Sequence, residues 1–342
     1  MISRMRCWAC YSMPESGTVP RTLFIEISTE CNFRCKHCHM WMTKDPAGVL
    51  TPQEKVVVIG DFAALNPLGE VVLTGGETMK RSDEFFLLLN AVNAHGLRGS
   101  CNTNGSYISA SNVERLLNEG PKYLVISLDS QRKELHDYVR GVDGAFDSAV
   151  SAIKCLLERK RSLPGTRTEV LTNSVLFEEN VREVSEFVEF AEALGLDGIT
   201  FQMLGETFWN QNPREDVFYR DHFFKDVSMA REALSRLAEM IDTHPIVRTT
   251  NADIRWMQMY LENPNGLEEQ VCGSHEKNLI VDSLGRVKLC FNMARIFKTP
   301  WIGHVRDDSV IQIWNSDARY HAAEVMSRCR LSCGMLNCHR KN

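Results

Sequence analysis

The sequence predicts an α/β fold, an open partial (β/α)6 TIM-like barrel followed by a small C-terminal α+β extension. Strand-like and helix-like segments alternate six times between residues 22 and 203 and are joined by short loops. Such alternation requires a parallel sheet with right-handed crossovers. Six strands are too few to close an eight-stranded barrel, so we expect the sheet to stay open. The last 71 residues have a different pattern, a hairpin followed by a helix.

The expected elements follow from periodicity and end signals. We expect strands at 22–28, 70–74, 97–103, 122–128, 167–176 and 198–203. Helices are expected at 52–65, 82–95, 111–118, 144–161, 181–194, 221–242 and 253–262. Thr51 before Pro52 is a typical helix start, Ser82 and Asn180 are expected as caps, and Gly195 is a typical helix end. The chain divides into an N-terminal segment (1–21), a core (22–215), linking helices (216–270) and a C-terminal domain (271–342).

Composition excludes several classes of protein. The 342 residues are 44% hydrophobic and 24% charged, which is ordinary for a globular protein. A formal net charge of −5 gives no basic footprint for nucleic acid. No apolar run reaches the roughly 18 residues of a membrane-spanning helix, and no signal peptide is expected. We therefore expect a cytoplasmic protein in which the clustered cysteines, among 12 in all, bind metal rather than pair as disulfides.

Three of these cysteines directly follow the first strand. Cys31, Cys35 and Cys38 have the spacing C-x3-C-x2-C. Three thiolates on a four-iron cluster would leave one iron without a protein ligand, and an open metal position is where chemistry can occur. This stretch resembles the signature of the radical S-adenosylmethionine (radical SAM) enzymes. A structural zinc site completed by His37 or His39 is the alternative.

The resemblance implies a [4Fe–4S] cluster on the three cysteines, with SAM chelated to the open iron. In the family a Gly-Gly-Glu-Pro segment binds the SAM amino group, and here Gly75-Gly76-Glu77 is followed by Thr78. Further positions that resemble the family's contacts to the SAM ribose and carboxylate are Asn104, Ser127, Asp129 and Arg140. Turn and cap chemistry is the alternative for the first three, and a structural ion pair is the alternative for Arg140.

A second group of cysteines lies near the C-terminus. A hairpin predicted over 278–289, with Gly285 in its turn, would bring Cys272 and Cys290 together. A helix predicted at 317–326, capped by Ser316, leads to Cys329, Cys333 and Cys338. This region resembles the SPASM/twitch extension of radical SAM enzymes, which implies an auxiliary [4Fe–4S] cluster on four of the five cysteines. Which cysteine is in excess stays open, and a four-thiolate zinc site is the alternative.

The resemblance implies an enzyme that cleaves SAM to a 5′-deoxyadenosyl radical and abstracts hydrogen from its substrate. We expect a small polar sugar, aminocyclitol or nucleoside intermediate that undergoes dehydrogenation, epimerisation or decarboxylation, as in natural-product biosynthesis. Flavodoxin or ferredoxin is implied as electron donor. Candidate substrate contacts are Glu26, which we expect to point inward, and Glu206, Trp209 and Asn210 in the loop after the sixth strand. The sequence identifies no catalytic residue.

Two other functions remain open. The first is modification of a ribosomally made peptide, which we consider less favoured because peptide-modifying members often carry an N-terminal docking domain and only 21 residues precede the first strand. The second is a non-enzymatic iron–sulfur scaffold or redox sensor. The Gly75-Gly76-Glu77 segment and Asn104 argue against a scaffold, because a scaffold needs no SAM pocket.

Overall fold

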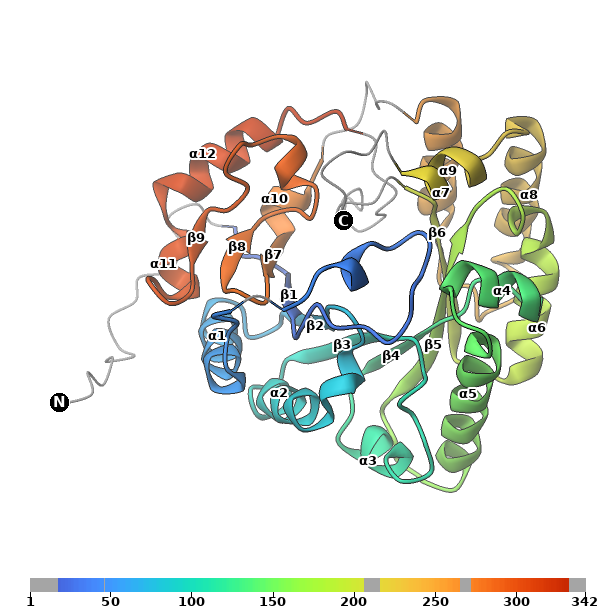
Figure 1. Cartoon of the computed structure of the whole chain (residues 1–342), viewed down its shortest axis with the longest axis horizontal. Helices are drawn as coiled ribbons and strands as arrows, with labels where there is room; N and C mark the ends of the chain where they lie inside the picture. Colours follow the sequence, from blue (N-terminus) through green and yellow to red (C-terminus); the bar gives the residue numbers. More distant parts are fainter. Residues whose placement is uncertain (1–17, 46, 206–215, 265–271, 332–342) are drawn as a thin grey trace.

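The computed structural model describes residues 18–45, 47–205, 216–264 and 272–331. Their strands form one nine-stranded sheet in the order β6-β5-β4-β3-β2-β1-β7-β8-β9. Strands β1 to β6 pair in parallel, each with the next along the chain. This confirms the predicted open (β/α)6 sheet, which curves around a central space in Figure 1.

The six parallel strands lie close to the predicted ranges. Their bounds are β1 Thr22–Glu26, β2 Glu70–Thr74, β3 Arg98–Thr103, β4 Tyr123–Ser127, β5 Glu169–Leu176 and β6 Gly198–Met203. Successive side chains alternate between the two faces of the sheet. Leu23 and Ile25 of β1 belong to the main core on the helix side, whereas Thr22 and Phe24 line the inside of the barrel. The packed core therefore lies between sheet and helices, and the inside is left for a ligand.

Helices cover the outer face of the sheet (Figure 1). Those of the core are α1 Pro52–Leu65, α2 Ser82–Ala94, α3 Val113–Asn118, α4 Lys133–Arg140, α5 Ala145–Arg161 and α6 Val184–Leu194. Thr51 caps α1 in a full capping box with Glu54, as the sequence indicated. Gly195 ends α6 with a φ of 84°, the left-handed conformation that glycine adopts without strain.

Three predictions on helices need correction. The predicted helix 221–242 is two helices, α7 Val217–His222 and α8 Val227–Met240, because Asp226 accepts a hydrogen bond from the Met229 N–H and starts a new helix there. Ser82 is the first residue of α2 rather than its cap. Asn180 does not cap the helix that follows it, and its side chain bonds the backbone of other residues instead.

The C-terminal region continues the same sheet. Strand β7 (Asn278–Val281) pairs in parallel with β1, and β8 (Arg286–Lys288) and β9 (Gly303–His304) follow antiparallel. Gly285 occupies the β7–β8 turn with a φ of 95°, which confirms the predicted hairpin. The remaining helices are α9 Asn251–Glu262, α10 Ser274–Lys277, α11 Val310–Trp314 and α12 Asp317–Met326.

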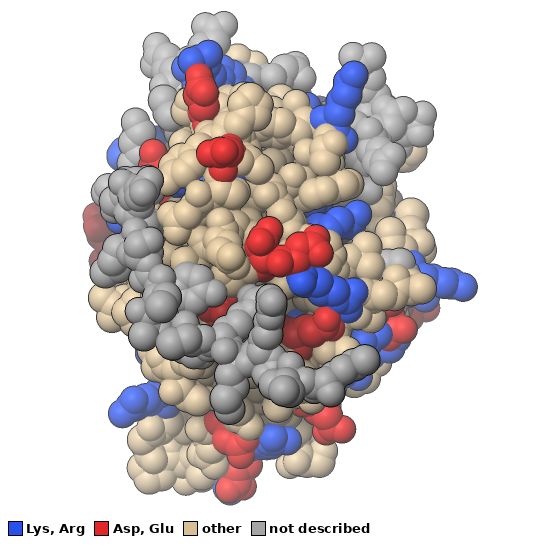
Figure 2. Space-filling view, turned by 90° about the vertical axis from the view of Figure 1, so that its left-hand side faces the viewer, with Lys and Arg blue, Asp and Glu red and all other residues tan. Residues whose placement is uncertain are grey.

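The surface gives two further facts. The described residues contain no helix that is long and apolar enough to cross a membrane. On the face shown in Figure 2, Lys and Arg side chains are interspersed with Asp and Glu, and neither sign forms one large patch. That distribution agrees with the modest net charge of the chain.

Candidate functional site

The three-cysteine motif lies in the loop that leaves the C-terminal end of β1. Cys35 is buried, and Cys31 and Cys38 pack beside it. The loop reaches across to α4 (Figure 1), where the Arg34 N–H donates to the Arg140 carbonyl and the Lys36 N–H to the Val139 carbonyl, at 3.2 and 2.8 Å. These bonds hold the middle of the loop over the open side of the barrel.

The chemistry of these thiols fits an iron–sulfur cluster. Burial raises the pKa of Cys31 to about 11, and it raises the pKa of Cys38 to about 12, with a further increase from the neighbouring Cys35. Bound iron would replace these protons and compensate the thiolate charges. Among the described residues, no three His, Cys, Asp or Glu side chains are placed to hold a single metal ion. In a four-iron cluster, each cysteine binds a different iron.

A buried ion pair lies directly behind Cys35. The Arg140 Nε lies 2.8 Å from Asp129 Oδ2, and the positive charge of Arg140 also acts on the Cys35 thiol, where it lowers the pKa against the larger effect of burial. Burial disfavours ionisation of Asp129, but Arg140 and then His37 outweigh it and hold the pKa of that carboxyl below its usual value. The structure therefore shows the ion-pair alternative for Arg140, and a SAM contact by Arg140 or Asp129 stays a prediction.

Two histidines stand beside this pair, and both favour the neutral form. Burial, followed by the charge of Arg140, lowers the pKa of His37 to about 4 and that of His136 to about 4. The Nδ1 of His136 accepts a hydrogen bond from the Asp129 N–H at 3.1 Å. Arg140 is therefore the cation of this pocket at neutral pH.

The Gly-Gly-Glu segment packs against the start of the cysteine loop. A Cβ on Gly75 would lie 2.4 Å from the Ser28 carbonyl oxygen, and one on Gly76 would lie 2.1 Å from that of Glu30. The buried carboxylate of Glu77 accepts from the Met79 N–H, the Thr103 hydroxyl and the Asn104 N–H. Glu77 therefore ties the end of β2 to the end of β3, and a SAM contact by Gly75, Gly76 or Glu77 stays a prediction.

Asn104 joins the same site through its side chain. It donates to Asn32 Oδ1 at 2.9 Å, and Asn32 in turn donates to the Ser106 hydroxyl at 2.9 Å. The three residues link the end of β3 to the loop between Cys31 and Cys35. Neither Asn32 nor Ser106 was predicted from the sequence. Asn32 directly follows Cys31, a predicted cluster ligand, and that position could have indicated it.

Ser127 lines a large cavity inside the barrel. The cavity has a volume of about 740 Å³ and runs along the inner face of the parallel strands. Near the C-terminal ends of the strands its walls are polar, with Asn102, Ser127, Asn173, Thr200 and Gln202. Its middle is more apolar, with Phe24, Val72, Val125 and Leu171. Its other end lies at the N-terminal ends of the strands and is lined by charged side chains, Arg21, Glu70, Arg98, Glu169, Arg248 and Lys277. The described lining residues include none of the cysteine loop, and a ligand there could hydrogen-bond to the polar wall near the C-terminal ends of the strands.

Glu26 lies on the inner face at the end of β1, as expected. It is 4% exposed, and its Oε2 accepts from the Ser283 N–H at 3.2 Å. Burial, reinforced by Asp282, raises the pKa of Glu26 to about 7, while Lys288 acts in the opposite direction. This carboxyl is poised to be protonated near neutral pH, and it joins the core to the β7–β8 turn. A contact with substrate stays a prediction.

Glu26→Gln should remove a pH dependence of folding stability. Because the folded state raises this pKa, the folded protein holds a proton that the unfolded chain releases between about pH 4.5 and 7. Stability from this group is therefore present at low pH and lost as pH rises through 7. The variant should be more stable than the wild type at pH 8, by up to about 2–3 kcal/mol, and equal near pH 4, below the ordinary pKa of 4.5. Urea unfolding at both pH values measures this; a pH-independent difference would contradict it.

The C-terminal cysteines are partly described. Cys272 and Cys290 are buried, and Ser274, two residues after the first, donates to the carbonyl of Leu289, just before the second, at 2.6 Å. The helix α12, which precedes Cys329, packs on α10. Three of the five predicted ligands therefore lie in neighbouring elements. Cys333 and Cys338 lie outside the described residues, as do Glu206, Trp209 and Asn210.

Comparison with known proteins agrees with this geometry. The model of the radical SAM superfamily matches residues 25–191, and that of the SPASM iron–sulfur cluster-binding domain matches residues 272–339. The AdoMet-dependent heme synthase of Methanosarcina barkeri is 33% identical over 178 residues, which are 52% of this chain and 48% of that protein. The chain spans about half the length of this and similar heme synthases.

Two other similarities extend over more of the chain. The antilisterial bacteriocin subtilosin biosynthesis protein AlbA of Bacillus subtilis is 22% identical over 299 residues, 87% of this chain and 60% of that protein. The crystal structure of Streptococcus suis SuiB bound to its precursor peptide SuiA superposes with a TM-score of 0.69 at 18% identity, covering 94% of this chain and 71% of that one. At this identity the second similarity concerns the fold alone.

Proposed function

The chain belongs to the radical SAM superfamily and carries a SPASM domain, and from this premise we propose that it abstracts hydrogen from a polar substrate held in the barrel cavity. Its cofactors are SAM and [4Fe–4S] clusters. When bound, the three-cysteine cluster supplies the electron that cleaves SAM to methionine and a 5′-deoxyadenosyl radical. The proposed reaction class is that of an oxidoreductase or lyase, in which hydrogen abstraction leads to dehydrogenation, epimerisation or decarboxylation.

The observation that carries this proposal is the cavity along the inner face of the parallel strands, whose wall is polar near the C-terminal ends of those strands. Its volume of about 740 Å³ lies within the range of small-molecule sites. The polar wall formed by Asn102, Ser127 and Asn173 can bind hydroxyl, amine or carboxylate groups of a substrate. A small polar metabolite is therefore the first substrate class that we propose, and natural-product biosynthesis is the setting in which we expect it.

The residues of this chain have distinct proposed roles. Cys31, Cys35 and Cys38 would hold the first cluster, and four of the five C-terminal cysteines would hold the auxiliary one. The backbone of Gly75-Gly76 and the side chain of Asn104 would bind SAM. Arg140 would compensate the charge at Cys35, because its positive charge favours the thiolate. A low-potential flavodoxin or ferredoxin is the proposed electron donor.

Modification of a peptide is the second candidate. It is favoured by one observation: the similarity to AlbA, a bacteriocin biosynthesis protein, covers 87% of this chain, whereas that to the first heme synthase covers 52%. An extended peptide segment could occupy the same cavity. The polar side chains of its wall near the C-terminal ends of the strands can also form hydrogen bonds with a peptide backbone.

An isotope experiment tests the function and separates the two substrate classes. Cells of the source organism grown in D₂O would provide an extract, divided into fractions below and above about 1 kDa, the size of a short peptide. Each fraction would be incubated with the reduced enzyme and unlabelled SAM. Deuterium in 5′-deoxyadenosine from the small fraction would support the metabolite, and deuterium from the large fraction the peptide. Absence of 5′-deoxyadenosine under all conditions would contradict both and favour a scaffold or sensor.

A further inference from the structure

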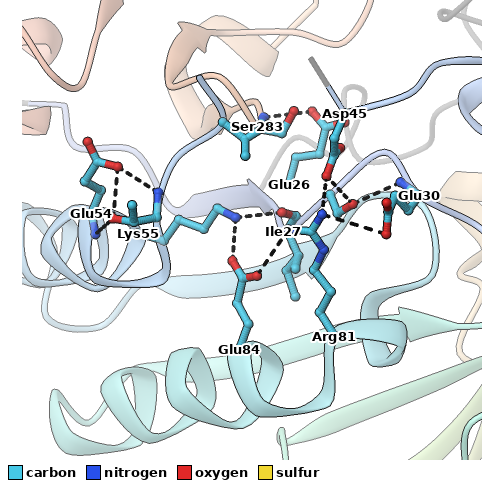
Figure 3. Close-up of polar contacts among 12 residues, drawn as sticks. Glu26, Ile27, Glu30, Asp45, Glu54, Lys55, Arg81, Glu84 and Ser283 are labelled. Carbon is cyan, nitrogen blue, oxygen red and sulfur yellow. Dashed lines mark hydrogen bonds and ion pairs between the residues drawn. The ribbon is translucent and has the colours of Figure 1, made fainter. Parts of the chain in front are cut away.

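The carboxylate of Asp45 joins the two ends of the loop that carries Cys31, Cys35 and Cys38, which is the cysteine loop (residues 28–45). We call the joined ends, Ser28, Thr29 and Asp45, the neck of this loop. The loop begins at Ser28 and Thr29, two residues after the end of β1, and Asp45 at its other end lies beside them. Asp45 accepts from the Ser28 hydroxyl at 2.7 Å, the Thr29 N–H at 2.7 Å and the Thr29 hydroxyl at 2.9 Å (Figure 3). A single side chain thereby joins the two ends of the loop, Ser28 and Asp45, which are 17 positions apart in the sequence.

The same carboxylate connects the loop to the Gly-Gly-Glu segment. Arg81, at the end of the short 3₁₀ helix that follows Glu77, donates to Asp45 Oδ2 at 2.5 Å (Figure 3). On the other side of the neck, the Gly76 N–H donates to the Ser28 carbonyl at 2.7 Å. The neck is therefore bonded at both ends of the segment proposed to bind the SAM amino group.

The charge of Asp45 is maintained by these partners. Burial acts against ionisation, but the Thr29 N–H and the two hydroxyls outweigh it and hold the pKa of Asp45 below its usual value. Hydrogen bonds to a charged acceptor are stronger than those between neutral groups. Four of them on one carboxylate make the neck a rigid point in a loop that otherwise has no regular strand or long helix.

We propose that Asp45 is a positioning residue that fixes the cysteine loop relative to the Gly75-Gly76 segment. It is not among the proposed ligands of the cluster or of SAM, and it would act through Ser28, Thr29 and Arg81. Because the loop would hold the cluster and the segment would bind SAM, loss of Asp45 should change how SAM meets the cluster before it changes the fold. The inference rests on the proposed SAM site.

The test compares two substitutions with one matched control. Asp45→Ala removes all four bonds, and Asp45→Asn keeps an acceptor for Thr29 but loses the charge facing Arg81. Glu30→Gln is the control, since Glu30 lies in the same loop and also faces Arg81, at 3.8 Å, but does not bridge the neck. The measurements are iron release to a chelator, and the electron paramagnetic resonance spectrum of the reduced cluster with and without SAM.

Asp45→Ala should release about four of its irons at least about tenfold faster than the wild type, as expected when charged hydrogen bonds are lost. Asp45→Asn should keep its iron but need about tenfold more SAM to produce the wild-type spectral change. Glu30→Gln should match the wild type in both. Wild-type iron release and SAM response in Asp45→Ala would overturn the inference. Absence of SAM cleavage in the wild type would instead count against the proposed function, since iron release is still measurable.

Discussion

Replacement of Cys31, Cys35 and Cys38 together by alanine should lower the iron of the reconstituted protein from about eight to about four atoms per chain. The first cluster loses all its protein ligands. The auxiliary cluster keeps its ligands, because the C-terminal cysteines lie in other elements. Formation of 5′-deoxyadenosine should disappear completely, because no iron of the first cluster is then left for SAM to chelate. Iron and sulfide analysis after anaerobic reconstitution, with chromatography of the nucleoside product, measures both.

Two further variants make this result specific. Cys101→Ala removes a thiol that is buried in the core between sheet and helices, so iron should be unchanged. Cys272→Ala/Cys290→Ala should also lower iron to about four atoms but leave SAM cleavage detectable. If the wild type held only about four irons, and the triple variant almost none, the C-terminal cysteines would bind zinc or no metal. The oxidative part of the proposal would then lose its second redox centre.

The sequence predicted the elements best where short-range signals mark both ends. The bounds of α1 and α12 agree with prediction because Thr51 and Ser316 cap them locally. The break between α7 and α8 was missed because apolar periodicity continues across it, although Asp226 was a possible cap. Helix α4 was missed because its residues were considered only as a motif around Arg140.

The candidate site shows the same division between local and distant information. The spacing of Cys31, Cys35 and Cys38 is a local pattern and needs no structure to be recognised. The roles of Glu77 and Asp45 depend on partners 26 and 36 residues away, Thr103 and Arg81 respectively, which no periodicity indicates. Residues that orient a site are therefore harder to predict from sequence than residues that would bind its cofactors.

Lys55 is a buried cation that supports the end of β1. It lies on α1 with 0% of its surface exposed, and its Nζ donates to the Ile27 carbonyl at 2.6 Å and to Glu84 Oε1 at 2.5 Å (Figure 3). A lysine in an amphipathic helix normally reaches solvent with its charged end. The pattern of residues in α1 therefore does not indicate that Lys55 is buried. Its partner Glu84 comes from α2, 29 residues along the chain.

Lys55→Met should lower the free energy of unfolding by about 3–5 kcal/mol, because it leaves Glu84, whose side chain is only 9% exposed, without its nearest cation. Adding Glu84→Leu should recover part of the loss, since a buried ion pair replaced by apolar side chains is often neutral. Urea unfolding of both variants measures this. Lys133→Met is the control: Lys133 pairs with Asp147 at the same 2.5 Å, but both side chains are exposed, and solvent screens the pair. If Lys55→Met and Lys133→Met were equally mild, burial would not be what makes the Lys55 pair important. If only Lys55→Met destabilises the chain, and also lowers its iron content, the α1–α2 contact beneath β1 is part of what holds the cysteine loop in place.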